Sequence, residues 1–196
     1  MELFLILAII FLVIFSFTKV NYNMISIYSE TTKKYYKVRN DKRTDEAVKI
    51  LERVDLVFTS LIDEFTKNTQ KYDSIKLNGG ITAANIFEDF KKRKDSIIIQ
   101  EKPYYSTGSS STHRKQLLFL CLRDEEGNFH NENLIMYVAL HELAHIICPE
   151  YGHTQLFKEI FYLVVKEAIN KGYYKIVDYS KEPQEYCGTT VKTSIV

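Results

Sequence analysis

Three histidines in one short region place the strongest constraint on how this chain can fold. His141 and His145 are four residues apart within the sequence His-Glu-Leu-Ala-His, and His153 follows eight residues later. Residues four apart project from one face of an α-helix, so both imidazoles can reach a single metal ion if this segment is helical. The third imidazole can reach the same ion only if the chain reverses before His153. The sequence therefore predicts a helix, a turn and a second helix around one metal ion.

Local signals around the motif agree with this arrangement. Asn131 can cap the first helix, and apolar residues continue through the motif. Pro149 disfavours further helix because proline pushes the preceding residue out of helical geometry. Gly152 provides a turn, and a second helix is predicted to begin near Thr154 and to stop at Gly172.

The residue types predict a catalytic metal rather than a structural one. Three neutral imidazoles, from His141, His145 and His153, leave a fourth zinc position open for water. Glu142 is predicted to be the general base that takes a proton from the zinc-activated water and passes it to the leaving amine. Tyr151, in the turn, could donate a hydrogen bond to the developing oxyanion. We therefore predict a Zn²⁺-dependent endopeptidase that acts on a protein or peptide substrate.

Alternatives to this assignment remain open from the sequence. Glu159 or Glu167, on the following helix, could replace His153 as the third ligand, and Cys148 could bind zinc as a thiolate. The rival function is a non-catalytic, membrane-tethered interaction protein with a structural zinc site. Glu142 distinguishes the two, because a structural site of three histidines does not need a carboxylate at that position.

The motif also resembles a known group of enzymes. His141 to His145, followed by His153-Thr154-Gln155-Leu156-Phe157, resembles the zincin metallopeptidases of the WLM and SprT-like groups. The likeness covers about residues 116–170 and implies zinc binding by the three histidines, with Glu142 as catalytic base. Members of these groups are associated with proteolysis of proteins crosslinked to DNA. This chain has a net charge of only +1 and no obvious DNA-binding module, so no specific nucleic acid partner is predicted.

An apolar run opens the chain. Every residue from Leu3 to Phe15 is apolar, and the first charge after Glu2 is Lys19. As a helix the uncharged run is about 24 Å long, somewhat short of a hydrocarbon core of roughly 30 Å. A cleaved signal peptide would carry Lys or Arg before the run. We therefore predict a retained transmembrane anchor at residues 1–20.

Charge and cysteine content predict the side of the membrane. Several Lys and Arg residues follow the anchor and none precedes it, which places the remaining chain on the cytosolic side of a single-pass membrane protein. Cys121, Cys148 and Cys187 are odd in number and far apart in sequence. They are not a disulfide framework and are predicted to be small buried hydrophobic residues in a reducing compartment.

The rest of the chain predicts an α+β, zincin-like fold with a small β-sheet, scaffold helices and an active-site helix. Residues 21–42 are predicted to be a juxtamembrane connector, and residues 43–196 the metallopeptidase domain. The expected scaffold elements are helices at residues 44–67 and about 82–92, and strands at 97–99, 116–123, 173–179 and 189–196. The strand at residues 116–123 is expected to offer an edge to an extended substrate. His113 and His130, which flank it, are expected to lie outside the metal site.

Overall fold

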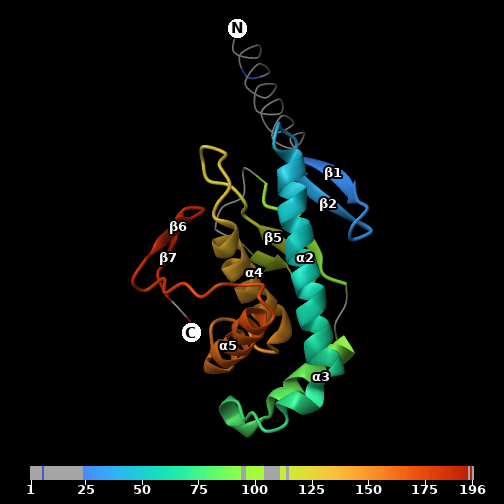
Figure 1. Cartoon of the computed structure of the whole chain (residues 1–196), viewed down its shortest axis with the longest axis vertical. Coiled ribbons are helices and arrows are strands. Elements are labelled where there is room, and N and C mark those ends of the chain that lie inside the picture. Colours follow the sequence, from blue (N-terminus) through green and yellow to red (C-terminus); the bar gives the residue numbers. More distant parts are fainter. Residues whose placement is uncertain are drawn as a thin grey trace.

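The computed structural model describes residues 24–93, 96–103, 111–113 and 115–193, together with Ile6 and Ile195. They form an α+β architecture with three small sheets (Figure 1). The helices are α2 (Thr44–Lys67), α3 (Ala83–Arg93), α4 (Glu132–Ile147) and α5 (Gln155–Asn170), with short 3-10 helices η1 (Thr69–Tyr72) and η2 (Asn78–Gly80). The strands are β1 (Met24–Ser29), β2 (Lys34–Arg39), β3 (Ile98–Glu101), β4 (Ser111–His113), β5 (Leu117–Leu120), β6 (Gln184–Tyr186) and β7 (Thr189–Val191).

The membrane predictions require a correction. The predicted anchor at residues 1–20 lies outside the described residues, apart from Ile6. Among the helices that the structure describes, none is long and apolar enough to cross a membrane. The longest, α2, has 24 residues but carries charged side chains at both ends, and α4 and α5 have only 16 each. This finding overturns the predicted transmembrane helix and the single-pass location with a cytosolic domain.

The segment predicted to be a connector contains an antiparallel hairpin, in which Met24 of β1 lies opposite Arg39 of β2. Tyr36 anchors the hairpin to α2, because its buried hydroxyl donates a hydrogen bond of 2.6 Å to Asp55. The neighbouring Tyr35 is exposed. Since aromatic residues occupy both buried and exposed positions, the sequence does not show the alternation that would have predicted these strands.

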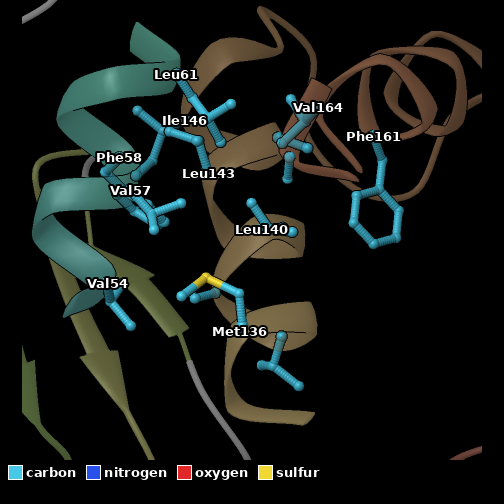
Figure 2. Packing of buried hydrophobic residues seen from close by; sticks show 14 of the residues in the cluster. Val54, Val57, Phe58, Leu61, Met136, Leu140, Leu143, Ile146, Phe161 and Val164 are labelled. Carbon is cyan, nitrogen blue, oxygen red and sulfur yellow. The ribbon is translucent and has the colours of Figure 1, made fainter. Parts of the chain in front are cut away.

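Helix α4 lies at the centre of the core. It packs between α2 and α5 (Figure 2), and 12 of its 16 residues are buried. The residues that meet there are Val54, Val57, Phe58 and Leu61 of α2, Met136, Leu140, Leu143 and Ile146 of α4, and Phe161 and Val164 of α5. Because a closely packed core resists displacement of its side chains, α4 is a rigid support for the residues that it presents.

The three-stranded sheet has the order β3-β5-β4. Strand β5 is parallel to β3 and antiparallel to β4, so both of its edges are paired. The expectation that this strand offers an edge to a substrate is therefore wrong, and β4 is an outer strand instead. The predicted strand at residues 173–179 is also absent, whereas β6 and β7 pair as a hairpin near the end of the chain.

Two of the three cysteines are joined, contrary to the expectation from their spacing. Cys121, directly after β5, forms a disulfide bond with Cys187, in the turn between β6 and β7. The two cysteines are 66 residues apart, so no local sequence pattern indicates that they pair. The β6–β7 hairpin brings Cys187 to Cys121 in the folded chain. Cys148 is buried at the end of α4 and takes no part in this disulfide.

A buried charged cluster connects β2, β3 and the residues after β5. Glu101 Oε2 accepts a hydrogen bond of 2.7 Å from the backbone nitrogen of Arg39, and Glu101 Oε1 lies 3.0 Å from Arg123 Nε. Arg123 also pairs with Asp41. The side chains of Glu101 and Arg123 are only 0% and 3% exposed, so the two charges form a buried ion pair.

We expect Glu101→Gln to lower the free energy of unfolding by about 3 kcal/mol, because it removes the buried carboxylate that faces Arg123 and leaves this guanidinium with the partly exposed Asp41. Urea denaturation followed by circular dichroism measures this change. Glu46→Gln is the matched control, since it removes the exposed partner of Arg43 and should leave the urea midpoint near that of the wild type. Equal midpoints for the two variants would contradict the role assigned to Glu101.

Candidate metal centre

The three histidines that the sequence predicts as metal ligands lie close together in the structure. Helix α4 holds His141 and His145 one turn apart, and the turn after α4 returns His153 to them. Their three Nε2 atoms lie 3.0–3.2 Å from one another. Three nitrogens that bind one tetrahedral zinc ion are about 3.3 Å apart, given Zn–N bonds of roughly 2.0–2.1 Å. The spacing is therefore close to that of a three-histidine ligand set.

Local sequence signals explain the reversal between the two helices. The Asn131 side chain caps α4 by accepting hydrogen bonds from two backbone N–H groups of the first turn. The helix ends at Ile147, and the next residue, Cys148, has an extended backbone before Pro149, as the proline predicted. Gly152 has a φ of 80°, which suits glycine, and Thr154 Oγ1 caps α5.

Phe157, in the first turn of α5, supports all three imidazoles. Its ring stacks on His145 with centroids 4.0 Å apart, and it meets His141 and His153 edge-on at 5.0 Å. Burial, with a smaller effect of the neighbouring imidazoles, lowers the pKa of His141 to about 3 and that of His145 to about 4. Both side chains are therefore neutral at pH 7, which is the protonation state that metal binding requires.

Glu142 lies beside the histidines and lines the same cavity as His141 and His153. Its side chain is largely buried, and this burial raises its pKa to about 7. A carboxyl group with such a pKa can accept and release a proton near neutral pH. The pairing of a buried carboxyl group with three imidazoles is an arrangement suited to hydrolysis.

The cavity beside these residues has a volume of about 640 Å³. Helices α4 and α5 form one side of it, with Tyr137 and Phe161 among the apolar residues. The other lining residues belong to the C-terminal segment: Tyr186 of β6, Thr189 to Val191 of β7, and Lys192, Thr193 and Ile195 after it. The Tyr137 hydroxyl donates a hydrogen bond of 2.9 Å to the Thr193 carbonyl and so attaches this segment to α4. The sequence did not predict that this C-terminal segment lines the cavity, because the segment lies about 50 residues beyond the motif.

The alternative glutamate ligands are engaged elsewhere. Glu159 Oε2 accepts a hydrogen bond of 2.6 Å from the backbone nitrogen of Asn78. Glu167 Oε2 lies 3.2 Å from Lys71 Nζ. The structure therefore brings His153, and neither of these carboxylates, to the other two histidines.

Tyr151 and Cys148, which the sequence offered as site residues, are not among the residues that line the cavity. Tyr151 is 86% exposed and is not one of the residues that line it; Lys115 Nζ lies 5.1 Å from the centre of its ring. The carbonyl of Cys148 accepts a hydrogen bond from Lys115, and its thiol does not belong to the histidine group. His130 belongs to a different group of side chains, and the side chain of His113 lies outside the described part of the chain.

Comparison with known proteins defines relatives of the chain. "Uncharacterized protein R325" of Acanthamoeba polyphaga mimivirus is 34% identical over 194 residues, which cover 98% of this chain and 94% of that protein. "Uncharacterized protein 136R" of Invertebrate iridescent virus 6 is 38% identical over 81 residues, or 40% of this chain and 43% of that protein. "Uncharacterized protein 042R" of Invertebrate iridescent virus 3 is 35% identical over 91 residues, or 46% and 50% of the two chains.

The same comparisons correct the predicted fold. No family model matches the chain, and no solved structure matches it. The prediction of a zincin-like fold is therefore replaced by the architecture described above, an α+β arrangement with three small sheets. The resemblance to the WLM and SprT-like groups stays a prediction from the motif.

Proposed function

This chain belongs to the same family as the mimivirus protein R325, and we propose that it is a zinc-dependent metallopeptidase that hydrolyses peptide bonds. The observation that carries the proposal is the convergence of three imidazole nitrogens beside a buried carboxyl group on the wall of a cavity. His141, His145 and His153 would hold the zinc ion, and Glu142 would act as the general base.

The donor set fits a catalytic zinc ion. Neutral imidazoles are preferred zinc ligands, and three of them leave one tetrahedral position open. When bound, zinc supplies a Lewis acid that polarises the scissile carbonyl and acidifies a water molecule. The cavity beside His141 and His153 provides the space in which a substrate reaches that position.

The chain's own residues perform the proton transfer. Glu142 accepts the proton of the attacking water and delivers it to the leaving nitrogen, which would otherwise depart as a poor leaving group. Its position is well defined because α4 packs between α2 and α5. Phe157 stacks on His145 and contacts His141 and His153 edge-on, and these contacts orient the three ligands.

Strand β4 supports a peptide as the substrate class. It is an outer strand of the three-stranded sheet and contacts α4, which carries the metal ligands. An extended peptide can add to such an edge through backbone hydrogen bonds. Recognition of this kind depends on the substrate backbone and requires an unfolded or extended segment.

Metal removal tests the proposal. Dialysis against a chelator should abolish cleavage of an unfolded protein substrate, and one equivalent of zinc should restore it, because the reaction needs the Lewis acid. The packing of α4 on α2 and α5 should keep the metal-free protein folded, which circular dichroism checks. Folded wild-type protein that binds zinc but cleaves no substrate would favour the alternative, a non-catalytic interaction protein with a structural zinc site.

A further inference from the structure

A second group of potential metal ligands lies away from the three-histidine centre. It consists of Cys121 after β5, His130 before α4 and Cys187 in the β6–β7 turn. One ligand atom from each residue lies within 4.8 Å of the other two, and His130 Nε2 is 3.1 Å from Cys187 Sγ. The group joins three parts of the chain that are distant in sequence.

The surroundings hold these side chains in place. The His130 ring packs against Tyr186 with centroids 4.9 Å apart, and the Tyr186 hydroxyl donates a hydrogen bond of 2.6 Å to the Cys121 carbonyl. Cys121 is buried, and His130 and Cys187 are partly buried. The imidazole nitrogen thus faces a sulfur atom, which is a weak hydrogen-bond acceptor. Two thiolates and an imidazole in this arrangement are, in contrast, a strong ligand set for zinc.

We propose that Cys121, His130 and Cys187 form a second metal site, which binds one zinc ion when the two thiols are reduced and is closed by the disulfide when they are oxidised. The Cα atoms of the cysteines are 6.4 Å apart, close to the upper end of the usual disulfide range of roughly 4.4–6.8 Å. Rotation of the side chains can therefore separate the sulfurs to the ~3.8 Å expected for two Zn–S bonds of about 2.3 Å. The Arg123 carbonyl oxygen lies 3.4 Å and 3.6 Å from the two sulfurs, and it or a water molecule completes four ligands.

Reduction converts the disulfide into the two thiols that bind zinc. A phosphine reductant breaks the S–S bond by transferring two electrons, the sulfurs take up two protons from water, and the phosphine becomes its oxide with the oxygen of that water. Zinc then displaces both protons as the thiolates bind it. This site shares no ligand with the three-histidine centre, so the proposal does not depend on peptidase activity.

The experiment measures bound zinc in the full chain after equilibration with zinc under two conditions. We expect two equivalents per chain after anaerobic reduction with a phosphine, and one equivalent for the oxidised protein. Cys187→Ser should bind one equivalent under both conditions, whereas His153→Ala should lose the first site and keep the reducible one. Cys148→Ala, the matched cysteine control, should still bind two equivalents after reduction. Equal zinc content in the reduced and the oxidised wild-type protein would overturn the proposal.

Cobalt binding to the wild-type protein provides a second measurement, which does not require any variant to fold. Reduced wild-type protein loaded with Co²⁺ should show a sulfur-to-cobalt charge-transfer absorption, because only the second site contains thiolates. The oxidised protein should lack it. His130→Ala retains both cysteines and should bind the second equivalent about tenfold or more weakly. A spectrum without the sulfur band in the reduced protein would also overturn the proposal.

Discussion

Glu142→Gln is expected to lower kcat/KM for peptide cleavage by about 10²–10⁴-fold, the usual contribution of a general base. The amide has nearly the same shape as the carboxyl group but cannot accept the proton of the attacking water. Because the three imidazoles alone make up the ligand group, the variant should retain one equivalent of zinc at the histidine centre. Cleavage of a quenched fluorescent peptide, measured beside the zinc content, checks both parts of this prediction.

Glu150→Gln is the matched control for this variant. Glu150 is an exposed glutamate in the turn after α4 and does not line the cavity, so its substitution should leave kcat/KM near the wild-type value. If Glu142→Gln retained both zinc and wild-type activity, Glu142 would not be the general base.

His153→Ala is expected to weaken zinc binding at the histidine centre by more than roughly 100-fold. Loss of a residue that only hydrogen-bonds to a ligand costs roughly 10–100-fold in affinity, and loss of a ligand itself should cost more. It removes one of the three nitrogens that converge within 3.2 Å, and the remaining pair lies on a single helix. Peptide cleavage should be lost at zinc concentrations that saturate the wild type. Competition with a chromophoric chelator measures the affinity, with the protein kept oxidised so that the cysteine group does not contribute.

The two glutamates that could replace His153 serve as controls. Glu159→Gln and Glu167→Gln should bind zinc as tightly as the wild type, since Glu159 contacts Asn78 and Glu167 pairs with Lys71. Unchanged zinc affinity in His153→Ala together with weaker binding in either glutamine variant would assign the third ligand to that glutamate.

Local patterns in the sequence were sufficient for several helices. The alternating apolar spacing predicted α2 with the bounds observed, Thr44–Lys67. Asn131 predicted the start of α4 and Pro149 its end, and the next helix was predicted to begin near Thr154, where α5 begins. These features were predictable because capping and helical periodicity depend on residues a few positions apart.

Other features depend on pairing between distant segments, which no local pattern encodes. The sequence predicts a connector where β1 and β2 form a hairpin, because tyrosines occupy both buried and exposed positions in it. The edge expected for β5 is occupied by β4, and the expected membrane anchor has no counterpart among the described helices. Register and strand order are decided by tertiary contacts, so the two strand expectations failed where a partner segment had to be known.

By itself, the sequence determined the helix, turn and helix that carry His141, His145 and His153, because each signal lies within the same short stretch of chain. Only the tertiary structure decided that the three nitrogens meet at about 3 Å, that Glu142 is buried beside them, and that residues from β7 onward line the cavity. It also decided that Cys121 and Cys187 are neighbours of His130. The physical reason is that these contacts arise when α4 packs into the core and the C-terminal hairpin folds back beside it.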